Sequence, residues 1–236
     1  MKKLAIFVEG QTEQLFVEKL VTEIAGKHQL QIEKFKAHGG KQSPRRLSQL
    51  TATQPVNDTR YYVQIVDCAG DGRVASDVRD NYAGLVSSEF SGIIGLRDVA
   101  PDFTREEVPR LLQRLHFGIK TKPIQVVFVL SVMEIEAWFL AEHTHLRRLC
   151  DTVDCTTISR HIGFDITSFD VDMRPRPSED LSTIYKLMGL TYDKSRDVVQ
   201  QTVNVLEYER VYLELPKRVP GLVPLIQAID SFLSPN

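Results

Sequence analysis

Short apolar runs, each followed by an acidic residue, constrain the fold of this chain more than any other feature. The runs, each with the acid at or shortly after its end, are Leu4–Val8 (Glu9), Tyr61–Val66 (Asp67), Gly92–Leu96 (Asp98) and Ile124–Leu130 (Glu134). Continuous apolar runs of this length are typical of strands that are buried on both faces of a sheet. We therefore predict four buried strands, and a weaker alternating pattern over 31–37 adds another.

Helical patterns lie between these runs. Apolar residues recur at helical spacing in 14–25, and 74–87, 105–116 and 134–142 are also predicted to be helices. Strands that alternate with helices predict an α/β fold, with a Rossmann-like, largely parallel sheet flanked by helices. After about residue 145 the strand pattern fades, while 181–187, 196–206 and 222–233 remain helical. We therefore expect an α/β core over 1–145 and a mostly helical C-terminal extension over 146–236.

The acids at the strand ends are the main functional signal. The carboxyl ends of parallel strands meet at one edge of an open α/β sheet, where ligands bind. Carboxylate oxygens are the ligands that Mg²⁺ prefers. The candidate metal ligands are Glu9, Asp67, Asp98, Asp102, Glu134 and Glu136.

Each of these acids also has a plainer interpretation. Glu9 can simply close a turn, with Glu13 capping the next helix, and Asp102 can be a turn or capping residue. Glu134 and Glu136 diverge if both lie on a helix, so we expect only one of them to face the site. Trp138, close behind them, is interpreted as a core residue, and Cys68 as a small buried one.

Composition excludes several classes of protein. A formal charge of −2 excludes a uniformly basic nucleic-acid binder, so such contacts must come from a local patch or from metal ions. Arg97 and the basic loop 38–46, with Lys41 and Arg45, are the candidate contacts, although a solvated loop explains the latter equally well. The chain has no apolar run of membrane-spanning length, no signal-peptide pattern and only three cysteines, so we expect a cytoplasmic protein.

Three segments together resemble the Toprim superfamily, the catalytic domain of topoisomerases, bacterial primases and overcoming-lysogenization-defect nucleases. They are Val8-Glu9-Gly10-Gln11-Thr12-Glu13, Gly95-Leu96-Arg97-Asp98, and Met133 to Ala141. In this order they are most similar to an uncharacterised bacterial family of Toprim-like proteins. The resemblance covers roughly residues 1–145.

The resemblance implies a Mg²⁺- or Mn²⁺-dependent phosphoryl-transfer site. Glu9 stands at the family's acid/base or metal-binding glutamate, and Asp98 at the first aspartate of its Asp-x-Asp motif. The second aspartate is replaced by Ala100, so Glu134 or Glu136 is expected to supply the missing oxygen. The implied catalytic residues are Glu9, Asp98 and Glu136.

The first functional hypothesis is therefore a Toprim-type nuclease that cleaves DNA. Members of the resembled family often accompany an ATPase in gene neighbourhoods of the defence type, which implies an ATPase partner and a role in antiphage defence. The alternative, suggested by Ala100, is a catalytically decayed binding subunit of an ATPase complex. Another phosphoryl-transfer enzyme is a third hypothesis, and the sequence leaves the oligomeric state open.

Overall fold

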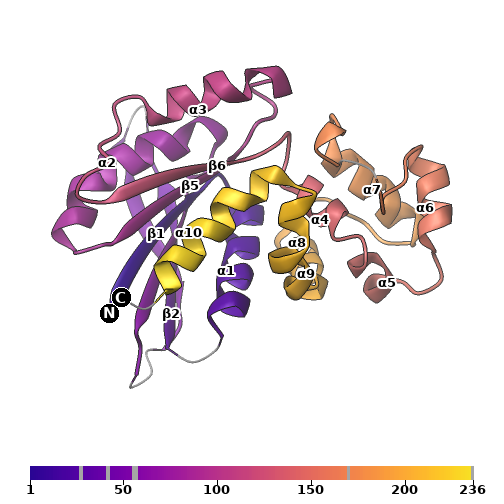
Figure 1. Ribbon diagram of the computed structural model, residues 1–236, viewed down its shortest axis with the longest axis horizontal. Coiled ribbons are helices and arrows are strands. Elements are labelled where there is room, and N and C mark those ends of the chain that lie inside the picture. The colour runs from indigo at the N-terminus through magenta and orange to yellow at the C-terminus, as the bar shows by residue number, and fades with distance from the viewer. Residues whose placement is uncertain (27–28, 41–42, 55–57, 169–170, 235–236) are drawn as a thin grey trace. The chain divides into compact units, whose positions relative to one another are not determined.

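The computed structural model of the chain describes residues 1–26, 29–40, 43–54, 58–168 and 171–234 (Figure 1). The strands are β1 (Lys2–Val8), β2 (Leu30–His38), β3 (Arg46–Ala52), β4 (Tyr61–Asp67), β5 (Gly92–Asp98) and β6 (Gln125–Ser131). The helices are α1 (Gln11–Ala25), α2 (Val74–Ser87), α3 (Val108–His116), α4 (Glu136–Ala141), α5 (His145–Leu149), α6 (Cys155–Ile162), α7 (Pro177–Leu187), α8 (Arg196–Val205), α9 (Tyr208–Leu213) and α10 (Val223–Leu233). Short 3₁₀ turns cover Asp71–Arg73, Arg105–Glu107, Val171–Met173, Leu215–Lys217 and Pro220–Leu222.

A six-stranded sheet in the order β3-β2-β4-β1-β5-β6 organises the fold. β4 and β5 both run parallel to β1, and β2 runs parallel to β4. In this register Val8 pairs with Asp67 on one side and with Leu96 on the other. The predicted α/β fold, with a largely parallel sheet flanked by helices and a helical C-terminal stretch, is thus confirmed.

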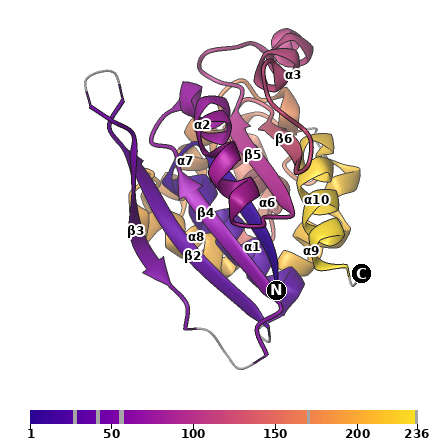
Figure 2. The ribbon, with the colours of Figure 1, turned by 90° about the vertical axis from the view of Figure 1, so that its left-hand side faces the viewer.

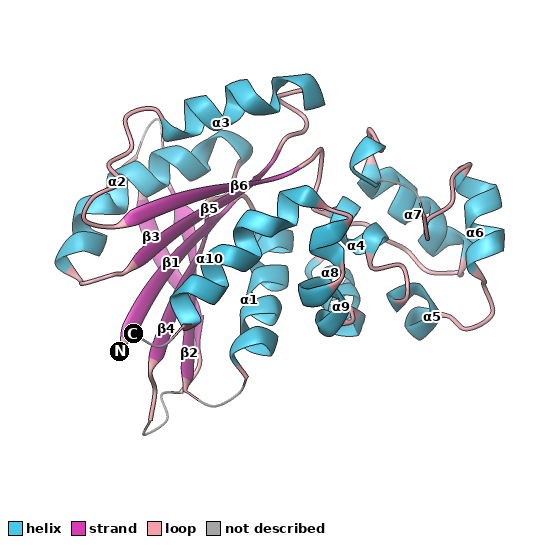
Figure 3. Cartoon of the chain, in the orientation of Figure 1, coloured by secondary structure: helices cyan, strands magenta, loops and turns pink. Residues whose placement is uncertain are grey.

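Helices cover both faces of the sheet. α2 and α3 lie on one face, and α1 and α10 lie on the other (Figures 1 and 3). The alternation along β5 follows this arrangement, because Gly95 faces Val74 of α2, whereas the neighbouring Ile94 lines a cavity beneath α10. A methyl group added to Gly95 would lie only 2.6 Å from ring carbons of Phe128, so close packing requires glycine here.

β3 is the strand that the sequence did not predict. It pairs antiparallel with β2 at the edge of the sheet (Figure 2). Its residues are mostly exposed, so it lacks the continuous apolar run of a buried strand. An edge strand needs only one hydrogen-bonding neighbour and little burial, which explains the weak signal.

The chain divides into two compact units, and each combines separate stretches of sequence. The first unit contains Met1–Arg97, Glu106–Leu130 and Pro224–Asn236, and the second contains Asp98–Arg105 and Ser131–Val223. The predicted domain division at residue 145 and these units divide the chain at different places. The first unit contains most of the sheet together with α10, the last helix of the chain.

The second unit is built from helices. α4 packs against α7, α6 packs against α7, and α5 packs against α8. Trp138, on α4, is 1% exposed, so its predicted role as a core residue is confirmed. In the part of the chain that the structure describes, no helix combines the length and the apolar character needed to cross a membrane.

Candidate acidic site

Glu9, in the first unit, lies in the turn from β1 to α1. β1 ends at Val8, Glu9 is partly exposed, and α1 begins after Gly10. The Glu13 carboxylate accepts a hydrogen bond from the Gly10 backbone N–H at 2.9 Å, so Glu13 caps the helix. The backbone carbonyl of Glu9 accepts the N–H of Gly70 at 3.1 Å. This bond joins the turn after β1 to the turn after β4.

Asp67 is the last residue of β4 and is 3% exposed. Its Oδ1 accepts the backbone N–H of Ala69 at 2.7 Å, and the Lys36 ammonium lies 3.7 Å from its Oδ2. The N–H of Cys68 donates to the carbonyl of Val8 at 2.8 Å. Asp67 therefore closes the turn after β4 directly beside the turn that contains Glu9.

Arg45 is held within the first unit. Its guanidinium donates two hydrogen bonds to Asp77, at 2.9 and 2.5 Å, and further bonds to the backbone carbonyls of Cys68 and Gly39. The hydrogen bonds to Asp77 raise the pKa of Arg45 above its ordinary value. These bonds explain Arg45 as an anchor for its loop, and its contact with nucleic acid stays a prediction.

The other residues of this unit that the sequence singled out are Cys68, Arg97 and Lys41. Cys68 is fully buried, as predicted, and burial raises the pKa of its thiol. Arg97, next to last in β5, is 4% exposed. Lys41, predicted to contact nucleic acid, lies outside the described residues.

The second unit brings three of the predicted acids near one lysine. Asp98 ends β5, is 8% exposed, and accepts a hydrogen bond from the Ser131 hydroxyl. Two backbone bonds, from Val99 to Ser131 at 3.1 Å and from Ala100 to Met133 at 2.8 Å, join the segments that follow β5 and β6. The bond to Ala100 shows that the backbone of this residue holds the loop together even though its side chain carries no acid.

Glu134 lies in the turn between β6 and α4. Its carboxylate accepts the backbone N–H and the hydroxyl of Ser178, both at 2.8 Å. Ser178 is the second residue of α7, so Glu134 binds the amino end of that helix, where the helix dipole favours a negative charge. The Lys194 ammonium lies 3.4 Å from Glu134 Oε1.

Glu136 opens α4 and is fully buried. Its Oε1 accepts the Tyr192 hydroxyl at 2.9 Å and lies 3.1 Å from the Lys194 ammonium. Within the described chain, its Oε2 has no hydrogen-bond partner. Burial raises the pKa of Glu136; the charge of Lys194 opposes this rise, and the charge of Glu134 adds to it.

Lys194 is the residue of this cluster that the sequence did not reveal. It lies between α7 and α8 with a left-handed backbone, φ 58°. Partial burial would lower its pKa, but the carboxylates of Glu136, Glu134 and Asp98 outweigh burial and raise it. No pattern in the sequence connects a loop lysine with acids about 60 residues earlier, and so tertiary structure alone identifies it.

These residues suit a cation in their chemistry more than in their arrangement. Asp98, Glu134 and Glu136 supply hard oxygen donors, and the orphaned Oε2 of Glu136 carries lone pairs that no proton donor satisfies. However, the described residues contain no group of three or more His, Cys, Asp or Glu side chains placed to hold a metal ion. In this conformation Lys194 is the cation that neutralises Glu134 and Glu136.

Asp102, the remaining predicted metal ligand, is exposed in the turn after β5.

Comparisons with known proteins identify no family. No family model matches the chain, and no curated protein matches it either. A solved structure titled as a hypothetical protein, PH0156 from Pyrococcus horikoshii OT3, is similar in fold over 97% of this chain and 99% of its own. Its sequence identity is 15% and its TM-score is 0.49.

Proposed function

We propose that this protein is a Mg²⁺- or Mn²⁺-dependent nuclease of Toprim type that cleaves phosphodiester bonds in DNA. The observation that carries the proposal is the contact of Glu134 and Glu136 with the ammonium of Lys194, whose pKa the charge of Asp98 also raises. Three carboxylates outnumber the one ammonium among them, and the excess of negative groups favours the binding of a cation. The resemblance to Toprim proteins supplies the rest of the proposal, including an ATPase partner and a role in antiphage defence.

In this proposal Asp98, Glu134 and Glu136 hold the metal, after Lys194 has moved away from Glu134 and Glu136. The ion would supply positive charge to a phosphodiester oxygen during cleavage. Three hydroxyl groups orient the carboxylates: Ser131 donates to Asp98, Ser178 to Glu134, and Tyr192 to Glu136. Such supporting donors fix the direction in which ligand oxygens point.

The acids of the first unit enter through the resemblance. Glu9 is proposed as the acid/base or metal-binding glutamate, and Asp67 as a further acid near it. Their contribution is measured separately, with Glu9→Gln and Asp67→Asn, because the cluster around Lys194 does not depend on them.

The test is plasmid cleavage by the full chain with Mg²⁺, Mn²⁺ or EDTA. We expect metal-dependent cleavage that Asp98→Asn and Glu136→Gln reduce by at least about 100-fold, which is the scale of losing electrostatic support for a transition state. Asp151→Asn changes an exposed acid of the same unit and serves as the matched control. Circular dichroism checks that each variant is folded. Cleavage that survives in the folded Asp98 and Glu136 variants would contradict the proposal.

A second candidate is a binding subunit without catalytic activity. The observation that favours it is the pair of contacts from Lys194 to Glu134 and Glu136, which supply a positive charge to these carboxylates without a metal. Calorimetric titration with Mn²⁺ distinguishes the two candidate functions. A nuclease binds the ion and loses it on Asp98→Asn, whereas the binding subunit retains DNA affinity with neither metal binding nor cleavage.

A further inference from the structure

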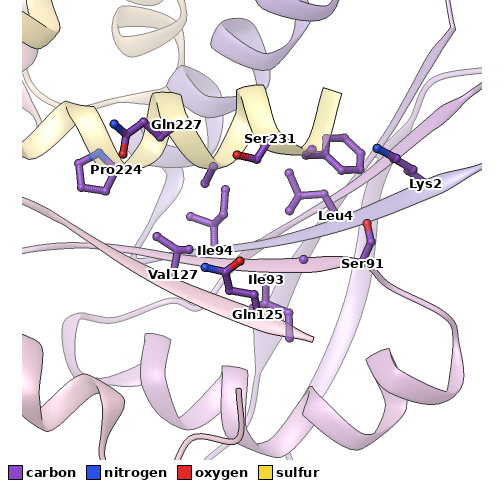
Figure 4. Close-up of a pocket in the computed structure, with 13 residues that line it drawn as sticks. Lys2, Leu4, Ser91, Ile93, Ile94, Gln125, Val127, Pro224, Gln227 and Ser231 are labelled. Carbon is purple, nitrogen blue, oxygen red and sulfur yellow. The ribbon is translucent and has the colours of Figure 1, made fainter. Parts of the chain in front are cut away.

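A pocket in the first unit lies apart from every acid discussed above. It has a volume of about 510 Å³ and lies between α10 and the amino-terminal halves of β1, β5 and β6 (Figure 4). This volume is within the range of pockets that bind small molecules, about 300–1,000 Å³. The acids follow the opposite, carboxyl ends of the strands, so the pocket is a separate feature of the sheet.

The sequence creates this pocket by placing small residues where a helix faces a sheet. The floor includes alternate residues of three strands: Lys2 and Leu4 of β1, Gly92 and Ile94 of β5, and Gln125 and Val127 of β6. The roof is α10, which contributes Pro224, Gln227, Ala228, Ser231 and Phe232. Ala228 and Ser231 on the roof leave space that larger side chains would fill.

Apolar and polar side chains share the lining of the pocket, and a charge lies at one end. Leu4, Ile94 and Val127 form an aliphatic floor, and Phe232 packs edge-on against Tyr61 with ring centroids 5.4 Å apart. Lys2 is the one charged residue among the described residues that line the pocket. In Figure 4, Lys2 and Pro224 lie toward opposite ends of the roof helix. Gln125, Gln227 and Ser231 add polar groups beside this floor, so an elongated ligand with an apolar chain and a negative group at one end matches the distribution.

The ammonium of Lys2 is held where such a group would lie. It donates one hydrogen bond to the carbonyl of Ser234, just beyond α10. An ammonium has three N–H donors, so this bond leaves donor capacity at the mouth of the pocket. The roof from Pro224 to Phe232 spans about 12 Å at the rise of an α-helix, the length of a medium alkyl chain.

We propose that this pocket binds a medium-chain fatty acid, with the alkyl chain between α10 and the sheet and the carboxylate on Lys2. A lysine ammonium acts as a point charge and needs no planar partner, which suits a carboxylate at the end of a chain. This inference does not depend on the proposed nuclease activity.

The test is calorimetric titration of the full chain with decanoate below its micelle concentration, supported by methyl NMR. We expect one site, with shifts for the methyl groups of Leu4, Ile94 and Val127 and none for Leu20 in the core of the first unit. Ala228→Phe fills the pocket and is expected to weaken binding by at least about tenfold. Lys2→Gln is expected to weaken it by about fivefold, the scale of an exposed ion pair.

Two matched substitutions control for general effects. Ala83→Phe makes the same change at an exposed position of α2, and Lys3→Gln removes a lysine whose ammonium bonds to Ser88 instead. Both controls are expected to bind decanoate as the unaltered chain does. Thermal unfolding confirms that all four variants are folded.

Decanol and acetate complete the experiment. Decanol lacks the charge and is expected to bind about fivefold more weakly, without further loss in Lys2→Gln, while acetate lacks the chain and is expected not to bind detectably. Equal binding of decanol and decanoate would overturn the assignment of the carboxylate to Lys2. Absence of decanoate binding, or binding that Ala228→Phe leaves unchanged, would overturn the proposal as a whole.

Discussion

His145 makes the second unit sensitive to acid, and its surroundings give the size of the effect. The side chain is fully buried on α5. Its Nδ1 lies 2.6 Å from the backbone carbonyl of Glu142, so Nδ1 carries the proton and donates it. Nε2 is buried and has no hydrogen-bond partner in the described chain. Protonation of Nε2 would therefore create a buried N–H donor and a buried charge together.

The direction of the pH dependence follows from the pKa of His145. Burial is the largest cause that lowers it, to about 4, and Arg148 and His143 add to this. The unfolded chain has a histidine pKa of about 6.5 and binds a proton first as the pH falls. Stability is therefore retained above pH 6.5 and is lost progressively between about pH 6.5 and 4. A difference of about 2.5 pKa units corresponds to about 3 kcal/mol.

Urea unfolding, followed by the fluorescence of Trp138, measures this loss. Trp138 is the one tryptophan of the chain and is buried in the same unit as His145. His145→Gln keeps an N–H donor for the Glu142 carbonyl but does not titrate. We expect the unaltered chain to lose about 3 kcal/mol more than this variant between pH 7 and pH 4.

A control variant tests whether the loss of stability depends on the burial of His145 or on the number of histidines. His161 is exposed on α6, so His161→Gln is expected to follow the unaltered chain at every pH. Glu142 has a carboxylate 3.8 Å from His145, and its own pKa is raised, with burial as the largest cause. If that carboxylate stabilised an imidazolium, the His145 variant and the unaltered chain would lose stability equally. That result would refute the reasoning.

Three further predictions follow from packing and charge. Lys194→Met leaves two carboxylates without their cation and is expected to lower the free energy of unfolding by about 2 kcal/mol at pH 7. The loss is smaller than for a fully buried ion pair because the lysine is partly exposed. Urea unfolding measures it, and Mn²⁺ is expected to restore part of the stability only if the acids bind metal. Gly95→Ala places a methyl against Phe128 and is expected to cost about 1–3 kcal/mol in the same measurement, whereas Gly84→Ala, with open space around it, should be neutral or stabilising. Arg45→Lys loses the two-point contact with Asp77 and is expected to lower the thermal midpoint by several degrees, with Arg46→Lys, at an exposed site, as the control.

The buried elements could be predicted from the sequence because burial itself leaves a pattern. The four apolar runs became β1, β4, β5 and β6, and the helical patterns became α1, α2, α3 and α4 with small shifts at the ends. β3 escaped because an exposed edge strand needs no apolar run. Local pattern therefore reports how deeply an element is buried, and says little about elements at the rim.

The acidic cluster could be predicted only in part. Asp98, Glu134 and Glu136 were recognisable because each follows a buried strand closely. Their partners were not, because Ser178 lies in α7 and Lys194 in the loop after it, about 45 to 60 residues later. A contact across such a distance in the chain depends on tertiary packing, which no local spacing encodes.

The discontinuity of the first unit imposes an order on folding. About 90 residues of the other unit follow the last strand of its sheet, and α10 comes only after them. During synthesis the apolar floor formed by Leu4, Ile94 and Val127 therefore emerges from the ribosome long before the helix that covers it. A fragment that ends at residue 145 would leave this surface permanently bare and is expected to aggregate rather than to behave as an independent domain.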